Sequence, residues 1–254
     1  MATPSFDMTG KVALLTGAGR GIGLAIAEAF AAAGCTVAIQ DVDQAVASAA
    51  AQQIERAGGR AIGIAGDATD LAYAATCVAE VEQRLGGLHV LVNNAAIQDR
   101  VNWLEQPPED ILRILSANVV APVMFCRAAV PIFVKQHWGR IVNLGSIQGR
   151  TGNLGMLPYS LSKAAIPKMT KALARAYGKE GITVNCIAPG WIASTHRNRN
   201  DFANEEEKVR GGQRVTVGRV GEPQDIAGTA LLLCTAAGEY ITGQTIYVDG
   251  GMSA

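Results

Sequence analysis

The sequence predicts an α/β fold in which a parallel β-sheet is covered by helices on both faces. Short runs of β-branched and apolar residues alternate with longer alanine-rich stretches along almost the whole chain. The chain has 254 residues, of which 49% are hydrophobic, enough for one large core. A glycine-rich turn directly follows the first apolar run. In folds of this kind ligands bind beyond the carboxyl ends of the strands, so we expect the functional residues there.

The expected strands are short and are separated by helical stretches. We predict strands at residues 12–16, 36–40, 61–65, 90–93, 140–144 and 183–187, and a seventh around Tyr247 and Val248. Alanine-rich segments with helical spacing lie at 24–33, 45–57 and 72–85, and each is followed by a glycine, Gly34, Gly58 or Gly86. We therefore expect residues 1–254 to form a single domain.

One polar stretch, at residues 195–214, interrupts the regular alternation of strands and helices. Its composition is typical of an inserted loop or lid rather than of a core element. We take residues 193–214 as the expected substrate loop.

The composition argues against several classes of protein. Twenty-two basic residues balance twenty-two acidic ones, so nothing favours nucleic acid or an anionic membrane surface as a partner. Five scattered cysteines without a CxxC pair predict free buried thiols, and His89 and His137 stand apart from any carboxylate cluster, so we predict no metal site. No uninterrupted apolar run approaches the roughly 18 residues that span a bilayer. We expect a cytoplasmic protein with a small-molecule substrate.

The glycine-rich turn, TGAGRGIG at residues 16–23, connects the first strand to a helix that begins near Ile22. Three glycines in this turn permit a tight bend, close approach of the backbone to a pyrophosphate and close packing of helix on strand. They are Gly17, Gly21 and Gly23. The spacing is GxxxGxG, and a turn of this kind by itself can also be a simple strand-to-helix connection.

A carboxylate at the end of the second strand bears on the choice of cofactor. Asp41 follows Gly23 at the distance where an acid can accept hydrogen bonds from an adenosine ribose and repel a 2′-phosphate, which favours NAD over NADP. The alternative is that Asp41 or Asp43 caps the next helix. Arg20 complicates the choice, because a guanidinium beside the turn can bind a 2′-phosphate.

Tyr159 and Lys163 form a YxxxK pair, which places both side chains on one face of a helix. A tyrosine titrates near pH ~10 in water, and a nearby ammonium would lower its pKa toward the range useful for proton transfer. Ser146 follows a predicted strand, where its hydroxyl could hold a substrate oxygen. The alternatives are a surface pair on the helix and a turn or N-cap serine.

Several motifs together resemble one family. In chain order they are TGAGRGIG at 16–23, NNAA at 93–96, Asn118, Ser146, YxxxK at 159–163 and PG at 189–190. With these spacings, essentially the whole chain resembles the short-chain dehydrogenase/reductase family. The resemblance implies a Rossmann-type, doubly wound sheet of seven parallel strands and a nicotinamide-dependent oxidoreductase acting on a CH–OH group.

The resemblance also implies roles for individual residues. Tyr159 would be the general acid/base, Lys163 would hold the nicotinamide ribose and lower the pKa of the tyrosine, Ser146 would orient the reacting oxygen, and Asn118 would order a water molecule on the proton route. Hydride transfer itself would belong to the cofactor.

Further cofactor contacts follow from the same resemblance. Asp67 and Ala68 would lie at the adenine, Asn94 and Ala95 beside the cofactor, the backbone from Pro189 through Gly190 to Ile192 against the nicotinamide amide, and Ser194 at the carboxamide. Two positions depart from the usual pattern, because Ala96 replaces a glycine and Ser194 replaces a threonine.

The substrate is less determined by the sequence. Polar candidates near the expected site are Gln148, Arg150, Asn153, His196, Arg197 and Arg199. They suggest a sugar, a polyol or a sugar acid, and hence a role in carbohydrate metabolism. The alternative is a solvated lid whose charges face water.

Other functions and assemblies stay open at this point. An NADPH-dependent ketoreductase acting on carrier-bound 3-oxoacyl chains and a non-catalytic NAD-binding sensor are the alternatives to a polyol or sugar dehydrogenase. The family resemblance implies a homotetramer formed through the helices that contain Asn118 and Tyr159. The apolar stretch at 119–125 suits such an interface and suits an internal core equally well.

Overall fold

The computed structural model describes residues 5–193 and 204–254. It contains one sheet of seven parallel strands, which confirms the predicted fold class. The strands are β1 (Val12–Leu15), β2 (Thr36–Asp41), β3 (Arg60–Ala65), β4 (Val90–Asn93), β5 (Gly139–Leu144), β6 (Ile182–Pro189) and β7 (Thr245–Val248). The expected strands are correct to within two residues at nearly every end, because each central strand is an apolar run buried on both faces.

The strand order is β3-β2-β1-β4-β5-β6-β7. The chain moves outward from β1 to β3 and then returns to place β4 on the other side of β1. The direction of winding therefore reverses between β1 and β4, and ligands of open α/β sheets bind outside the carboxyl ends of the strands at such a point.

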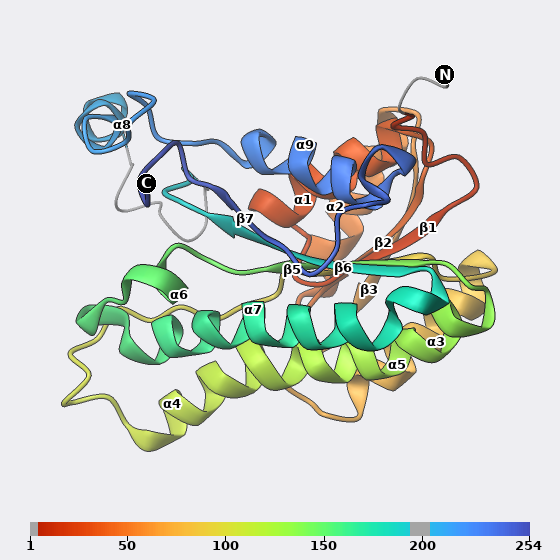
Figure 1. Cartoon of the computed structure of the whole chain (residues 1–254), viewed down its shortest axis with the longest axis horizontal. Helices are drawn as coiled ribbons and strands as arrows, with labels where there is room; N and C mark the ends of the chain where they lie inside the picture. Colours follow the sequence, from red (N-terminus) through yellow and green to blue (C-terminus); the bar gives the residue numbers. More distant parts are fainter. Residues whose placement is uncertain (1–4, 194–203) are drawn as a thin grey trace.

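Helices cover both faces of the sheet, as Figure 1 shows. The helices are α1 (Gly21–Ala32), α2 (Gln44–Arg56), α3 (Tyr73–Leu85), α4 (Pro108–Leu115), α5 (Ala121–Lys135), α6 (Gln148–Thr151), α7 (Leu157–Tyr177), α8 (Glu205–Gly212) and α9 (Pro223–Cys234). One layer holds α1, α2 and α9, and the opposite layer holds α3, α4, α5 and α7. Short turns lie at Leu154–Met156, Gly178–Glu180 and Ala236–Gly238, and a π-helical turn at Ser116–Val120 joins α4 to α5.

The core consists of two apolar clusters, one on each face of the sheet. Phe30 of α1 is fully buried in the first cluster, and Phe125 and Phe133 of α5 are fully buried in the second. Burial of one such side chain contributes about 1.5–3 kcal/mol. The alanines of the helices let the helix backbones lie close to the sheet, which keeps the strand ends in fixed relative positions.

The run Pro108–Lys135, which combines α4, the π-helical turn and α5, is long and apolar enough to cross a membrane by length and composition alone. The expectation concerned uninterrupted apolar runs, and Asn118 and Arg127 interrupt this one, so the two findings are compatible. Half of its most apolar window is buried inside the fold, and α5 packs against α3, β4 and β5. The buried core helix of a globular domain has the same composition, so this run is weak evidence for a membrane span.

The polar stretch expected to be an inserted loop is partly helical. Its residues from Glu205 to Gly212 form α8, a helix within the expected loop or lid that the sequence analysis did not predict. The Asn204 side chain caps this helix by accepting a hydrogen bond from the backbone N–H of Glu207, and three glutamates occupy its first turn. Both features stabilise a helix N-terminus, and the sequence NEEE carried that signal.

Candidate active site

Two cavities lie at the carboxyl ends of the strands and adjoin one another. One has a volume of about 790 Å³ and lies over β1, β2 and β4, and we call it the cofactor-side cavity. The other has a volume of about 570 Å³ and lies over β5, β6 and α7, and we call it the substrate-side cavity. Ile22, Asn94 and Gln98 line both. Volumes of this size are typical of sites for small organic ligands.

The glycine-rich turn forms one wall of the cofactor-side cavity, where Gly17, Arg20, Gly21 and Ile22 line it. Gly17 has a φ of 56°, and a Cβ atom there would come within 2.7 Å of the Cα atom of Ala95. Only glycine allows both this left-handed backbone and this close approach.

The N-terminus of α1 points its backbone N–H groups toward this turn. Arg20 occupies the N-cap position without a side-chain capping hydrogen bond, and the first turn holds no acidic residue. Uncapped N–H groups at a helix N-terminus attract an anion. The turn therefore fits the pyrophosphate of a dinucleotide.

Asparagine 94 fastens the turn to the neighbouring strand end. Its side-chain amide donates hydrogen bonds to the backbone carbonyls of Thr16 (2.9 Å) and Gly17 (2.7 Å). The Thr16 hydroxyl oxygen accepts from the backbone N–H groups of Asn94 and Ala95, each at 3.1 Å. Gly23 lies behind this arrangement rather than on the cavity wall, because a Cβ atom there would meet the Asn94 amide at 2.6 Å.

Asp41 and Asp43 have different positions, which separates the two alternatives left open by the sequence. Asp43 is the N-cap of α2 and accepts from the backbone N–H groups of Ala45 and Val46. Asp41 accepts instead from the backbone N–H groups of Gly19, at 3.2 Å, and of Asp43, at 3.3 Å. Both aspartates line the cofactor-side cavity, and Asp41 is only 9% exposed. Its carboxylate thus lies between the glycine-rich turn and the end of β2, where a ribose would bind.

The remaining cofactor candidates divide between the two cavities. Asp67, Ala68, Asn94 and Ala95 line the cofactor-side cavity, and Pro189, Gly190 and Ile192 line the substrate-side cavity. Gln40, which the sequence analysis did not single out, accepts a hydrogen bond from the N–H of Gly17 and donates one to the carbonyl of Gly66. It holds the turn against the loop that follows β3.

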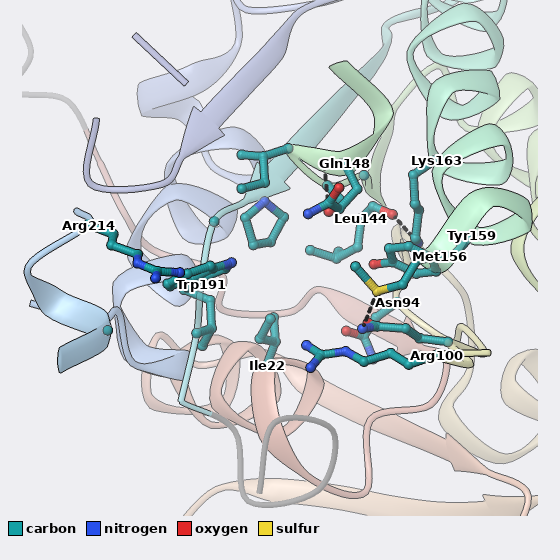
Figure 2. Close-up of a pocket in the computed structure, with 18 of the residues that line it drawn as sticks. Ile22, Asn94, Arg100, Leu144, Gln148, Met156, Tyr159, Lys163, Trp191 and Arg214 are labelled. Carbon is teal, nitrogen blue, oxygen red and sulfur yellow. Dashed lines mark hydrogen bonds between the residues drawn. The ribbon is translucent and has the colours of Figure 1, made fainter. Parts of the chain in front are cut away.

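Ser146, Tyr159 and Lys163 line the substrate-side cavity together. Figure 2 shows Tyr159 and Lys163 beside one another on α7. Tyr159 and Lys163 lie one turn apart on α7, and the lysine Nζ is 5.7 Å from the centre of the tyrosine ring. The lysine Nζ donates a hydrogen bond of 2.7 Å to the carbonyl of Leu144, the last residue of β5. Ser146 follows two residues later, and its hydroxyl oxygen accepts from the backbone N–H of Gln148 at 3.1 Å.

Asn118 lies outside the lining of both cavities and is 1% exposed. Its amide oxygen accepts from the backbone N–H of Ile97 at 2.7 Å, and its amide nitrogen donates to the carbonyl of Ile97 and to the hydroxyl of Ser162. Ser162 in turn donates to the carbonyl of Tyr159 at 2.7 Å. Asn118 therefore connects the loop after β4 to the helix that carries Tyr159, from a π-helical turn of the kind found at functional sites.

The substrate candidates are only partly brought together. Gln148 lines the substrate-side cavity. Arg150 is exposed, and its guanidinium carbon lies 5.3 Å from the centre of the Tyr247 ring. Asn153 is also exposed and caps the turn at Leu154–Met156. Neither lines the cavity. Ser194, His196, Arg197 and Arg199 lie outside the described residues.

Several lining residues were missed by sequence reasoning. Gln98, Arg100, Met156, Trp191, Glu207, Arg210 and Arg214 all line the substrate-side cavity. Trp191 lies within the segment expected at the nicotinamide, and Arg210 and Arg214 lie within the expected substrate loop. The sequence analysis therefore placed the segments that contain these residues at the site, although it did not single out the residues themselves. Arg100 comes from the loop after β4, where no pattern distinguishes it from other surface arginines.

The five cysteines and the two described histidines, His89 and His137, line neither cavity. The five cysteines are free and buried, and burial raises the pKa of the Cys186 thiol to about 11. Among residues 5–193 and 204–254, no group of three or more His, Cys, Asp or Glu side chains is arranged to hold a metal ion. His89 lies at the amino ends of the strands, where its Nδ1 atom accepts a hydrogen bond from the backbone N–H of Val12.

Comparison with known proteins matches this geometry. A family model described as "Enoyl-(Acyl carrier protein) reductase" matches residues 17–253. Galactitol 2-dehydrogenase of Agrobacterium fabrum is 39% identical over 253 residues, covering 96% of this chain and 98% of that protein. The 3-oxoacyl-(acyl-carrier-protein) reductase of Aquifex aeolicus is 35% identical over 246 residues, with coverage of 96% and 98%. The chain belongs to the short-chain dehydrogenase/reductase family.

A solved member of this family has the same fold. The structure of a gluconate 5-dehydrogenase from Burkholderia cenocepacia in complex with NADP and tartrate superposes with a TM-score of 0.91 at 31% identity, covering 97% of this chain and 96% of that one. This short-chain dehydrogenase/reductase is therefore an oxidoreductase that uses a nicotinamide cofactor to interconvert an alcohol and a ketone.

Proposed function

We propose that this protein is an NAD-dependent dehydrogenase that oxidises a secondary hydroxyl of a sugar, polyol or sugar acid to the ketone. The observation that carries the proposal is the convergence of Ser146, Tyr159 and Lys163 on one cavity that directly adjoins a second cavity lined by the glycine-rich turn and Asp41. A protein that only binds NAD has no need of this side-chain set, which disfavours the sensor alternative.

In the proposed mechanism Ser146 and Tyr159 act on the reacting hydroxyl of the substrate, and Lys163 acts on Tyr159. The Ser146 hydroxyl orients the substrate oxygen, and Tyr159, as the phenolate, accepts the proton from it and becomes the neutral phenol. The Lys163 ammonium, one helical turn away, stabilises the phenolate that must be present before this transfer. The cofactor, when bound, supplies the hydride acceptor. Asn118 contributes by holding α7 in position through Ser162.

The NAD preference rests on Asp41. A carboxylate at the end of β2, 9% exposed and held by the turn, suits the two hydroxyls of an adenosine ribose and repels a 2′-phosphate. Arg20 lines the same cavity and could favour the phosphate, and the relative from B. cenocepacia holds NADP. We give the carboxylate more weight, because like charges at the ribose oppose binding directly.

A ketoreductase acting on carrier-bound 3-oxoacyl chains is the second candidate, favoured by the likeness to the A. aeolicus reductase. It would require NADPH, with which Asp41 is a poor match. Docking of an acidic carrier protein would also be helped by a basic surface, and the chain carries no net charge.

We further propose a cytoplasmic homotetramer and a substrate loop at residues 193–214. Val120 at the end of the π-helical turn, Val123 on α5 and Leu161 on α7 are exposed apolar residues in the two helical segments expected at the interface. α8, which belongs to the proposed loop, contributes Glu207 and Arg210 to the cavity. Gel filtration with light scattering tests the assembly, and a monomer at micromolar concentration would contradict it.

The function is tested by assaying the purified protein with NAD and with NADP against sugars, polyols, aldonic acids and hydrophobic secondary alcohols. Reduction of NAD by one of the first three classes supports the proposal. Turnover of only 3-oxoacyl thioesters with NADPH, or binding of NAD without turnover of any substrate, would overturn it.

A further inference from the structure

We propose that the substrate is a polyhydroxylated carboxylic acid, whose carboxylate is bound by Arg100 and Arg214 and one of whose hydroxyls donates a hydrogen bond to Gln148. The inference rests on the proposed function and narrows its substrate class. It differs from the sequence-based expectation for Arg150, which does not line the cavity. Arg197 and Arg199 lie outside the described residues.

The charges that line the substrate-side cavity are mostly positive. Among the residues that the structure describes, four cationic side chains line it, from Arg100, Lys163, Arg210 and Arg214, against one carboxylate, from Glu207. The chain as a whole carries no net charge, so this excess is local. A cavity with fixed positive charges concentrates anionic ligands.

Arg100 and Arg214 approach the cavity from different segments, as Figure 2 shows. Arg100 extends from the loop after β4 toward Ile22. Arg214, which follows α8, lies along Trp191, and its guanidinium carbon is 6.0 Å from the centre of the Trp191 ring. The aromatic face restricts the orientations of this guanidinium, which lowers the entropic cost of binding a carboxylate in the bidentate manner that guanidinium prefers.

Gln148 provides the second observation. Its Oε1 atom is buried and has no hydrogen-bond partner among the described residues, although the side chain lines the cavity next to Ser146. A buried polar atom without a partner is unfavourable, so this position favours a ligand that brings a donor. A substrate hydroxyl near the reacting carbon supplies that donor, which an acyl chain does not.

The two kinds of contact can be separated with matched substrates. An aldonic acid and its alditol, such as gluconate and glucitol or galactonate and galactitol, differ only in a carboxylate against a hydroxymethyl group. The parent should prefer the acid of a pair in kcat/KM. Arg100→Gln and Arg214→Gln should each lower kcat/KM for the acid about 10- to 100-fold, the loss of one charge-assisted hydrogen bond, and leave the alditol nearly unchanged. Gln148→Leu should weaken acid and alditol alike, since both carry the hydroxyl.

Arg84→Gln is the matched control, because Arg84 pairs with Glu80 on the surface of α3 and lines neither cavity. Equal losses for acid and alditol in the arginine variants, with a raised KM for NAD, would assign these arginines to the cofactor and overturn the proposal. A parent preference for the alditol would overturn it as well.

Calorimetry separates failure of this inference from failure of the proposed function. Gluconate and glucitol are titrated into the protein saturated with NADH, where oxidation cannot proceed. If no substrate is turned over but gluconate binds and Arg214→Gln abolishes the binding, the anion site stands and the dehydrogenase proposal fails. If neither turnover nor binding of the acid is found, the inference is wrong.

Discussion

The two adjoining cavities are built in different ways. The cofactor-side cavity is lined by the glycine-rich turn and by residues that follow β2, β3 and β4, with glycines and alanines among them, and hydrogen bonds of Asn94 and Gln40 fix the turn in place. The substrate-side cavity is formed by long side chains that come from separate loops and from α6, α7 and α8. A cofactor shared by many enzymes can be held by invariable backbone geometry, whereas a particular substrate requires particular side chains.

The largest expected effect concerns the substrate-side cavity alone. Tyr159→Phe should lower kcat about 10²- to 10⁴-fold, because it removes the proton acceptor. Binding of NADH, followed by its fluorescence, should stay close to that of the parent. Substantial residual turnover would show that another group moves the proton, and a parallel loss of NADH binding would show that the two cavities are not separable in this way.

The next largest effect concerns the cofactor-side cavity. Gly17→Ala forces an alanine into a left-handed conformation and brings its Cβ atom within 2.7 Å of the Ala95 Cα atom. We expect at least a 10-fold loss of NADH affinity and a lower Tm, since the conformation alone costs about 1–2 kcal/mol. Gly58→Ala is the control, because Gly58 also has a positive φ of 88° but an added Cβ would meet nothing within 4 Å. If both variants bind NADH equally well, close approach at Gly17 is unimportant.

A change of cofactor preference should follow at Asp41. Asp41→Asn keeps an acceptor for the N–H of Gly19 but removes the negative charge, so the ratio of kcat/KM for NAD to that for NADP should fall about 10-fold or more. Asp43→Ala removes the cap of α2 instead. It should cost about 1 kcal/mol of stability without moving the cofactor ratio. A ratio that moves only in the Asp43 variant would reverse the two assignments.

The smallest effect is expected away from both cavities, at His89. Burial, and to a lesser extent Lys11, lowers the pKa of this imidazole, whose Nδ1 atom must be unprotonated to accept from Val12. Its contribution to stability is therefore present above the ordinary histidine pKa of about 6.5 and is lost as pH falls through the lower folded-state value. His89→Asn keeps an acceptor that does not titrate, so its Tm should fall less than that of the parent between about pH 8 and pH 5, with kcat unaffected. Parallel Tm curves would contradict this.

The sequence was sufficient where local chemistry decides the structure. The seven strands, the turn around Gly17, the pairing of Tyr159 with Lys163 and the position of Asp41 at the end of β2 follow from hydrophobic periodicity, from glycine and from helical spacing. Each of these features depends on a few neighbouring residues, so one stretch of chain carries the whole signal.

The tertiary structure alone decided which distant side chains share a space. It separated Asp41 from Asp43, made Asn118 a link between Ile97 and Ser162, and brought Arg100 and Arg214 to the wall where Arg150 was expected. The physical reason is that contacts between separate loops depend on the direction in which the chain leaves each strand. They also depend on how the intervening helices pack. The sequence lists the residues of each loop, but it does not show which of them come into contact in the fold.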